Sequence, residues 1–272
     1  MHKLACPKCH QALSLQGNSY YCENKHCYDL SKSKYINLLL NPDKATNNPG
    51  DSKESLIARK SYLNQGYYDG IVNTVIDIIK KYQTSNTMQI LDIGCGEGYY
   101  THKFKQALGD THCYYGLDIS KEAIHMATRY TKDIYWLVGN SKNLPVTDHS
   151  MDFLLALFTV VNQEELKRAL HENGYIIHVT ANPKHLIEIK ELIYDEIKIK
   201  SDKYIRLDFP VVESYDFIQE VTINNHEDAL NLLKMTPHYY HIKSEKRDVL
   251  QTIKNINITI DIKITVYQTS LT

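Results

Sequence analysis

The chain of 272 residues is 43% hydrophobic and carries 31 Lys and Arg against 32 Asp and Glu, for a net charge of −1. This length and hydrophobic content suit one medium-sized globular domain with a small appendage, and they exclude a disordered chain. No run of about 18 apolar residues occurs and the N-terminus lacks an apolar signal segment, so we expect a cytoplasmic protein without a membrane span.

Cysteine and positive charge are concentrated at the N-terminal end. Four of the six cysteines lie within the first 27 residues, which in a cytoplasmic chain indicates a metal site before a disulfide framework. Residues 1–60 hold nine Lys and Arg against five Asp and Glu. This basic excess is equally consistent with a phosphate-facing surface and with ordinary solubilising charge.

The cysteine pattern predicts a zinc site. Cys6 and Cys9 form a C-x-x-C pair, and Cys22 opens a second pair after twelve intervening residues. Each pair can hold one edge of the tetrahedron that Zn²⁺ prefers, and the spacing leaves the fourth ligand open between His26 and Cys27. A module this small needs the metal to fold, so we expect a structural site with no open position. Unpaired thiols and a disulfide framework are the alternatives.

We divide the chain into a zinc-binding module at 1–40, a linker and helix at 41–70, and a larger domain at 71–272. The linker is rich in Pro, Asn and Gly up to Gly50, and Asp51 or Ser52 can cap the helix that follows it. The apolar end of the module can pack it against the larger domain.

From about residue 70, apolar strands alternate with amphipathic helices as βαβ units do. The predicted helices are 70–81, 99–108, 121–130, 163–170, 183–196 and 228–233, and the predicted strands are 88–93, 113–117, 134–138, 153–157, 175–180, 217–223 and 256–267. Five strands alternating with helices indicate a parallel sheet, and the last two strands can form an antiparallel edge. We therefore expect an α/β, Rossmann-like domain with a mostly parallel, seven-stranded sheet.

An acidic glycine turn follows the first strand of this domain. Its residues are Asp92, Gly94, Gly96, Glu97 and Gly98. A dinucleotide site uses G-x-G-x-x-G to hold a pyrophosphate, which carboxylates would repel. The same carboxylates suit the ammonium and sulfonium groups of S-adenosylmethionine (SAM). The turn therefore predicts a SAM-dependent methyltransferase domain, and a glycine turn without a ligand is the alternative.

Three further residues lie near this predicted site. Asp118 ends the second strand, where its carboxylate can accept hydrogen bonds from ribose hydroxyls. Asn140 follows the third strand and suits either the adenine edge or a loop turn. Cys95 lies inside the glycine turn and is interpreted as a small filler, because no neighbouring histidine would activate it as a nucleophile.

Several motifs follow one another in an order typical of a known family. They are Cys6-Pro7-x-Cys9, Cys22-x-x-x-His26, Tyr35-x-Asn37-Leu38, Pro49-Gly50-Asp51-Ser52, Ala58-Arg59, Leu91 to Thr101 and Pro183-x-His185-Leu186. Together they resemble the bacterial 23S rRNA (guanine-N1)-methyltransferases of the RlmA type. The likeness extends from the first cysteine to about Pro237, which is nearly the whole chain.

The resemblance implies a zinc-binding, RNA-recognising module joined to a SAM-dependent domain. Its substrate would be N1 of one of two neighbouring guanines in a 23S rRNA hairpin. The resemblance favours His26 as the fourth zinc ligand, and it places Tyr68, Gly96, Glu97 and His185 at SAM. The implied partner is 23S rRNA, and a homodimer is left open.

Two segments depart from the family pattern. His171-Glu172-Asn173-Gly174 replaces the usual Lys-Pro-Gly-Gly turn before the fifth strand. The segment from Phe158 to Val161 lacks the Asn/Asp-Pro-Pro-aromatic motif of amino-group methyltransferases, which suits a ring-nitrogen target but leaves the catalytic residue unknown. His185, Asp195 and Glu196 are the candidates for the group that removes the N1 proton.

The target base would have to lie in a loop or be flipped into the site, because its Watson–Crick edge is normally paired. Two alternatives belong to other classes. One is a methyltransferase for another RNA or a small molecule, with a purely structural zinc module. The other is a non-catalytic RNA-binding protein on an inactive SAM fold.

Overall fold

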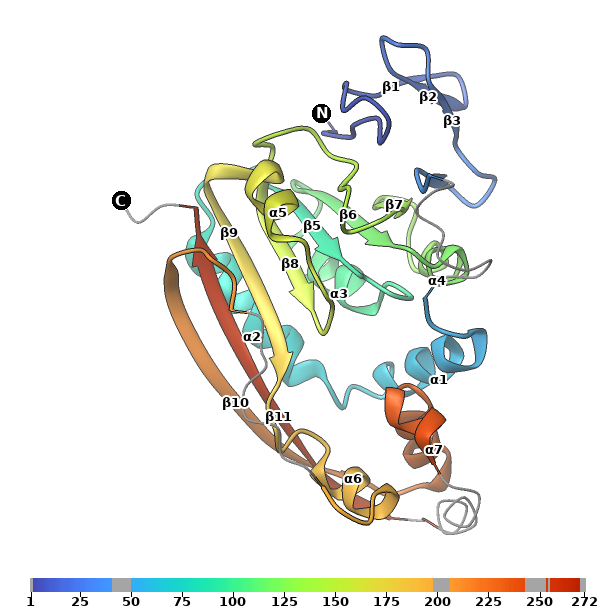
Figure 1. The fold of residues 1–272 in the computed structure, drawn as a ribbon, viewed down its shortest axis with the longest axis vertical. Helices are drawn as coiled ribbons and strands as arrows, with labels where there is room; N and C mark the ends of the chain where they lie inside the picture. The colour runs from blue at the N-terminus through green and yellow to red at the C-terminus, as the bar shows by residue number, and fades with distance from the viewer. Residues whose placement is uncertain (1, 41–49, 198–205, 243–252, 254, 270–272) are drawn as a thin grey trace.

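The computed structural model describes residues 2–40, 50–197, 206–242, 253 and 255–269. Within them, one large sheet has the strand order β10-β11-β9-β8-β5-β6-β7-β4 (Figure 1). Its strands are β4 (Tyr35–Asn37), β5 (Gln89–Ile93), β6 (Cys113–Asp118), β7 (Tyr135–Val138), β8 (Met151–Leu157), β9 (Leu170–Ala181), β10 (Val211–Ile223) and β11 (Ile256–Gln268). The pairs from β4 to β9 are parallel, whereas β11 is antiparallel to both β9 and β10.

The mostly parallel α/β fold is confirmed, but the expected number of seven strands is wrong. The sheet has eight strands in the described part of the chain, because β4 pairs in parallel with β7, with Tyr35 beside Trp136 and Asn37 beside Val138. Three residues are too few to show the period of a strand, so this edge strand was not predicted. The apolar end of the module therefore packs against the larger domain, as expected, by adding β4 to the edge of its sheet.

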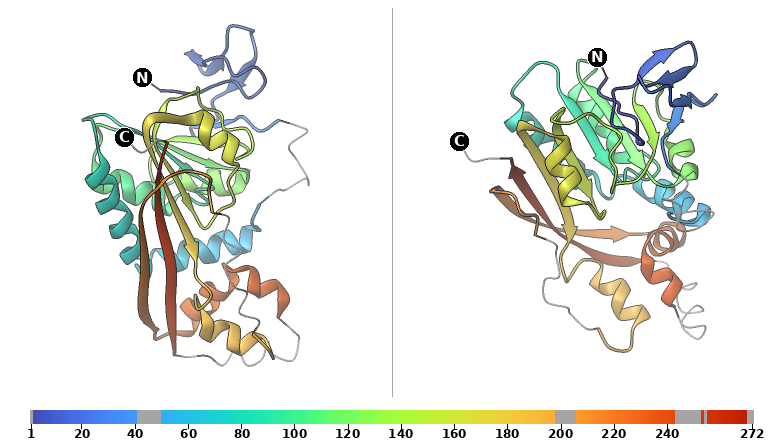
Figure 2. Two further views of the ribbon diagram at one scale, coloured as in Figure 1. Left: turned by 60° about the vertical axis from the view of Figure 1, so that its left-hand side comes forward. Right: turned by 45° about the horizontal axis from the view of Figure 1, so that its top comes forward.

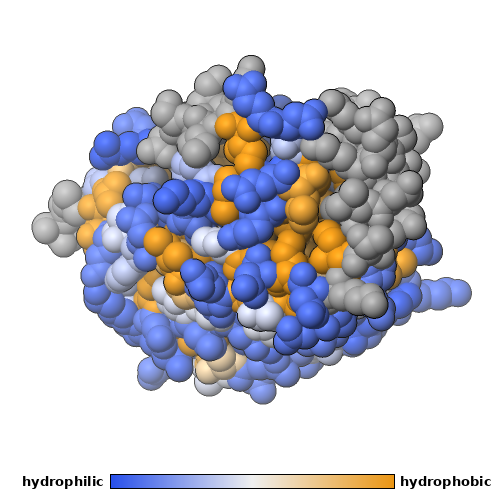
Figure 3. All heavy atoms as spheres, turned by 90° about the horizontal axis from the view of Figure 1, so that it is seen from below, coloured by the Kyte–Doolittle hydropathy of each residue, from blue (hydrophilic) through white to orange (hydrophobic). Residues whose placement is uncertain are grey.

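The helices lie on both faces of the sheet and at its lower end. They are α1 (Lys53–Leu63), α2 (Asp69–Tyr82), α3 (Tyr99–Leu108), α4 (Lys121–Ala127), α5 (Gln163–Ala169), α6 (Ile187–Ile193) and α7 (His226–Lys234), followed by the short 3₁₀ helix η2 (Pro237–His241). In Figure 1, α2 and α3 lie behind the sheet and α5 in front, while α1, α6 and α7 gather below it. Figure 3 views the molecule from below, where apolar residues reach the surface in strips between hydrophilic ones.

Most predicted elements are present, with shifted ends. Helix α6 begins at Ile187 rather than Pro183, because Leu186 has a left-handed backbone with φ of 52° that cannot continue a helix. Helix α4 ends at Ala127 rather than Tyr130. The turn expected at 171–174 lies inside β9, where the pairing with β8 is irregular between Met151 and Phe153. No helix in the described residues is long and apolar enough to cross a membrane.

The N-terminal module is a small antiparallel sheet at the top of Figure 1. It consists of β1 (Ser14–Gln16), β2 (Ser19–Tyr21) and β3 (Cys27–Asp29). Both views in Figure 2 place it at the end of the molecule away from α6 and α7. Apart from Gly50, the predicted linker at 41–50 lies outside the described residues, and the domain boundaries stay a prediction.

Candidate functional site: a metal cluster and an acidic cavity

Cys6, Cys9, Cys22 and His26 come together as the sequence predicts, with all four candidate ligand atoms within 4.8 Å of one another. The distances from His26 Nδ1 to the three sulfurs are 3.4, 3.5 and 3.4 Å, and the Cys9 and Cys22 sulfurs are 3.7 Å apart. A tetrahedron with Zn–S of about 2.3 Å and Zn–N of about 2.0 Å has edges of about 3.5 to 3.8 Å. The donor set and its spacing therefore fit Zn²⁺.

The fourth position, which spacing left open, belongs to His26. Cys27 is exposed and its sulfur points to Asp29, 4.0 Å from the Oδ1 atom, outside the cluster. The knuckle at Cys22 is closed by a 2.9 Å hydrogen bond from the Lys25 amide to the Cys22 carbonyl, with Lys25 in a left-handed conformation. This turn brings His26 back toward the sulfurs, and with four protein ligands the site is structural.

The metal module is fixed to the larger domain through its first residues. The Ala5 amide donates to the Pro145 carbonyl at 2.9 Å, and the Thr147 amide donates to the Lys3 carbonyl at 2.9 Å. Leu4 is 1% exposed and packs in one core cluster with Val146. Module and domain are therefore held by backbone hydrogen bonds as well as by apolar packing.

A cavity of about 460 Å³ opens at the carboxyl ends of β5, β6 and β8, a volume in the range of small-molecule sites. In an open parallel sheet, ligands bind where the strand order reverses, which here is the crevice between β5 and β8. Seven of the nine residues predicted for the cofactor line it, namely Tyr68, Asp92, Gly94, Gly96, Glu97, Asp118 and His185. The topology thus explains why residues far apart in sequence meet here.

The glycine turn needs its glycines for conformation and for space. Gly94 has a φ of 72°, and a Cβ atom there would lie 2.3 Å from the Thr159 hydroxyl. Gly98 has a φ of 89°, and its Cβ would lie 2.7 Å from both Ala127 and Trp136. Gly98 is not among the residues that line the cavity. Gly98 is constrained instead by the close approach of the start of α3 to α4 and β7, which leaves no room for a side chain.

Two buried carboxyl groups, Asp92 and Glu97, and the partly buried Asp118 form the acidic wall of the cavity. Burial raises the pKa of Asp92 to about 7, although the Thr101 hydroxyl donates to it at 2.6 Å. Burial likewise raises the pKa of Glu97 to about 7, against the opposing effect of a hydrogen bond from the Tyr130 hydroxyl at 3.1 Å. Desolvation penalises the charged form, so a bound cation would favour ionisation of both groups.

Asp118 connects the end of β6 to the glycine turn. Its carboxylate accepts hydrogen bonds from the Gly96 amide at 2.9 Å and from the Ser120 amide at 2.8 Å. Burial raises the pKa of Asp118, and these two amides counteract the rise. The remaining lone pairs are available to hydroxyl donors in the cavity, as ribose recognition requires.

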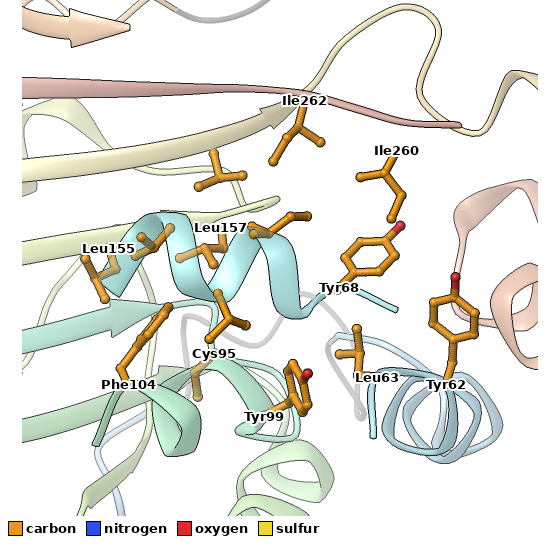
Figure 4. Packing of buried hydrophobic residues seen from close by; sticks show 14 of the residues in the cluster. Tyr62, Leu63, Tyr68, Cys95, Tyr99, Phe104, Leu155, Leu157, Ile260 and Ile262 are labelled. Carbon is orange, nitrogen blue, oxygen red and sulfur yellow. The ribbon is translucent and has the colours of Figure 1, made fainter. Parts of the chain in front are cut away.

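Tyr68 and His185 form the opposite wall. The Tyr68 hydroxyl lies 3.4 Å from His185 Nε2, and the Asp261 amide donates to His185 Nδ1 at 3.3 Å. Burial lowers the pKa of His185 to about 3, so the ring is neutral with its proton on Nε2. Figure 4 shows Tyr68 between Leu63 below it and Ile260 of β11 above it.

Three of the predicted positions lie elsewhere. Asn140 does not line the cavity, and its side-chain oxygen accepts from the Lys142 amide at 3.0 Å, which is the loop-turn role left open by the sequence. Asp195 and Glu196 are exposed beyond the end of α6 and do not line the cavity either. Of the three candidates for the proton acceptor, His185 alone lines the cavity within the described residues.

Sequence reasoning did not single out two cavity residues. Arg59 projects from α1, where it forms a 2.7 Å ion pair with Asp51 and donates to the Met235 carbonyl at 3.3 Å. Phe158 follows β8 and is 41% exposed. Arg59 is one of 31 Lys and Arg, so only its motif beside Ala58 could have indicated it. Phe158 begins a segment without a recognisable motif, so the sequence carries no signal for its role.

Comparisons with known proteins agree with both parts of this arrangement. The family model described as "RlmA, N-terminal" matches residues 4–45, which include the metal cluster. The family model described as "Methyltransferase domain" matches residues 90–176, which begin on β5 and include the glycine turn.

Two relatives align with most of the chain. One is YxjB of Bacillus subtilis, provisionally named a 23S rRNA (guanine-N(1)-)-methyltransferase, which is 27% identical over 95% of this chain and 94% of its own. The other is the 23S rRNA (guanine(748)-N(1))-methyltransferase of Streptomyces fradiae, which is 25% identical over 88% of this chain and 86% of its own.

Among solved structures, a Bacillus halodurans protein provisionally described as a methyltransferase covers 72% of this chain and 98% of its own length. The TM-score is 0.51 at 12% identity, so this likeness concerns the fold. Fold, metal cluster, cavity and both family models thus agree. Both parts of the chain resemble the RlmA-type methyltransferases, because an RlmA-type zinc ribbon is joined to a SAM-dependent methyltransferase domain.

Proposed function

We propose that this protein methylates N1 of a guanine in a hairpin of 23S rRNA. The observation that carries the proposal is the union of an RlmA-type zinc cluster and an acidic SAM cavity in one chain. Relatives named for this reaction align with both parts, and the S. fradiae relative is named for guanine 748. A cytoplasmic location follows from an rRNA substrate.

We assign the cavity residues to different parts of SAM, which supplies an activated methyl group on its sulfonium. Asp92 and Glu97 hold its positive charges, and Asp118 accepts from the ribose hydroxyls. Tyr68 and His185 close the wall that faces the glycine turn. Gly98 and Asn140 support the turn and the loop beside it, in place of the direct cofactor contacts expected from the sequence.

Arg59 completes this assignment. SAM also carries a carboxylate, which needs a cation in the cavity. Arg59 lies beside the glycine turn, with its Nη1 atom 3.4 Å from the point where a Gly96 side chain would begin. Burial raises the pKa of both Glu97 and Asp118, and the positive charge of Arg59 opposes that rise. We assign the methionyl carboxylate to Arg59, which forms an ion pair with Asp51 in the structure.

The residues at the transfer site mainly position and desolvate the reacting groups. Alignment of two reactants in a closed site can account for most of a rate enhancement. His185 is neutral because of its burial, but its Nδ1 already accepts from the Asp261 amide and its Nε2 carries the proton, so the ring can take the N1 proton only after it changes tautomer or partner. We therefore assign the removal of the N1 proton to no side chain of the cavity.

The direct test is methyl transfer in vitro to unmodified 23S rRNA, followed by nucleoside analysis. The proposal predicts 1-methylguanosine from the full chain. Incorporation of methyl groups only into other nucleosides or into small molecules would contradict it. Undetectable SAM binding in calorimetry would favour the non-catalytic alternative. Light scattering separately tests the homodimer, which stays a prediction.

A further inference from the structure

Phe158 has an unusual backbone conformation at the mouth of the SAM cavity. Its φ is 56°, in the left-handed region that bulky side chains rarely adopt and that costs about 1 to 2 kcal/mol outside glycine. A 2.9 Å hydrogen bond from its amide to the Val179 carbonyl holds this conformation. Glycine would avoid the strain, so fold stability does not explain a phenylalanine here.

The strained backbone places an apolar ring where solvent can reach it. The ring of Phe158 is stacked on His185, with centroids 6.0 Å apart and an interplanar angle of 21°. It meets the Tyr68 ring edge-on at 6.3 Å. Because the residue lines the cavity and is 41% exposed despite these two ring contacts, it offers apolar surface to the cavity.

The position of Phe158 in the sheet separates it from the nucleoside part of SAM. β5 lies between β6 and β8, so Asp118 at the end of β6 and Phe158 after β8 lie on opposite sides of the glycine turn. Thr159 packs against Gly94, which fixes the end of β8 beside that turn. If Asp118 binds ribose, Phe158 faces the side from which the methyl acceptor enters.

We propose that Phe158 is the stacking platform for the target guanine, and this inference rests on the proposed function. A purine flipped out of its hairpin loses its stacking neighbours, and an aromatic side chain can replace one of them. Such stacking accepts any base, because every base has a π-face. Phe158 would therefore position the base, while the choice of guanine comes from contacts to its edge.

The test compares kcat/KM for unmodified 23S rRNA in wild type, Phe158→Tyr, Phe158→Leu and Phe158→Gly, with SAM affinity measured by calorimetry on each. Tyrosine keeps the ring, whereas leucine keeps apolar character and the same backbone strain. Glycine guards against a folding defect, because it adopts the left-handed conformation freely. Ile218→Ala is the control, since Ile218 is 68% exposed on β10 and does not line the cavity.

The Tyr variant and the control should stay within about threefold of wild type. The Leu and Gly variants should lose about 10- to 100-fold in kcat/KM for RNA, with SAM affinity unchanged. Full activity in Leu, an equal loss in Tyr and Leu, or a parallel fall in SAM affinity would contradict the inference alone. A wild-type protein that binds SAM but leaves 23S rRNA unmethylated would contradict the proposed function as well.

Discussion

Asp92 and Glu97 are nearly fully buried, at 1% exposure each, and both line a cavity assigned to a cationic ligand. Their raised pKa, about 7 in both cases, means that each is partly protonated near neutral pH in the empty site. A cation binds the ionised form, so its binding must displace protons. The acidic wall therefore couples cofactor affinity to pH.

SAM affinity should rise between pH 6 and pH 8. Below pH 7 the carboxyl groups are mostly protonated and the cation must compete with protons, which weakens binding by about tenfold per coupled group at pH 6. Calorimetry at both pH values measures this. Glu97→Gln should bind SAM more weakly at pH 8 and show a smaller pH dependence, whereas Glu164→Gln, with an 81% exposed side chain, should match wild type. A pH-independent affinity in wild type would refute the coupling.

The stability of the protein without SAM depends on pH in the opposite direction. A carboxyl group whose pKa is raised by folding stabilises the protein below its unfolded pKa of about 4, and this contribution is lost as pH rises through the folded value near 7. The increase in melting temperature on adding SAM should therefore be larger at pH 8 than at pH 6. Equal increases at both pH values would argue against buried, protonated carboxyl groups.

Arg59→Gln should weaken SAM binding by about 10- to 100-fold, because the variant loses the charge-assisted hydrogen bond to the SAM carboxylate. The matched ligand is decarboxylated SAM, which keeps the ammonium and the sulfonium. Its affinity should differ little between wild type and the variant. An equal loss for both ligands would place Arg59 away from the carboxylate.

At the residue scale, the sequence predicted the acidic cavity residues Asp92 and Glu97 but not the basic residue Arg59. The carboxylates of Asp92 and Glu97 stood within a glycine turn of recognisable spacing, so sequence alone could connect them with a cation. Arg59 reaches the cavity from α1 because α1 packs against α7, a long-range contact with no local signal. Phe158 could not be predicted either, because its left-handed backbone depends on the end of β9.

At the scale of elements, the glycine turn is constrained most strongly where it meets α4 and β7. Gly98→Ala combines a left-handed φ with contacts of 2.7 Å, so it should lower the free energy of unfolding by about 2 to 4 kcal/mol. Gly17→Ala is the control, since Gly17 also has a positive φ but nothing lies within 4 Å of its Cβ position. It should cost about 1 kcal/mol. Urea denaturation measures the free energy of unfolding of both variants. Equal losses in the two variants would show that the close contacts with Ala127 and Trp136 add no cost.

Periodicity predicted the long elements well and the short ones poorly. α3 has the predicted bounds, Tyr99–Leu108, because Gly98 and Gly109 delimit it. β4 was missed because its pairing with β7 is a tertiary contact of a three-residue segment. α6 is shorter than predicted, since the conformation of Leu186 depends on its amide donating to the Thr259 carbonyl of β11.

At the scale of the whole molecule, the zinc ribbon lies at the end of the protein away from α6 and α7 (Figures 1 and 2). The metal cluster contributes no residue to the cavity lining. We therefore expect the ribbon to hold the RNA hairpin by phosphate contacts away from the target base, while the cavity binds SAM independently.

Loss of zinc should separate these two activities. Cys22→Ser should abolish stoichiometric zinc and lower methylation of RNA about tenfold or more, with SAM affinity within about threefold of wild type. Cys27→Ser is the matched control and should retain one zinc per chain, because its sulfur lies outside the cluster. Metal analysis, calorimetry and methylation assays measure the three quantities. Zinc loss in Cys27→Ser would overturn the ligand assignment.

Primer extension on rRNA from cells with and without this gene would show whether the protein methylates a guanine of 23S rRNA at N1. N1 methylation blocks Watson–Crick pairing, so reverse transcriptase stops at the modified base. The account predicts a stop at one guanine of a 23S rRNA hairpin that disappears when the gene is deleted and returns with the intact chain. An identical pattern of stops in both strains would contradict it.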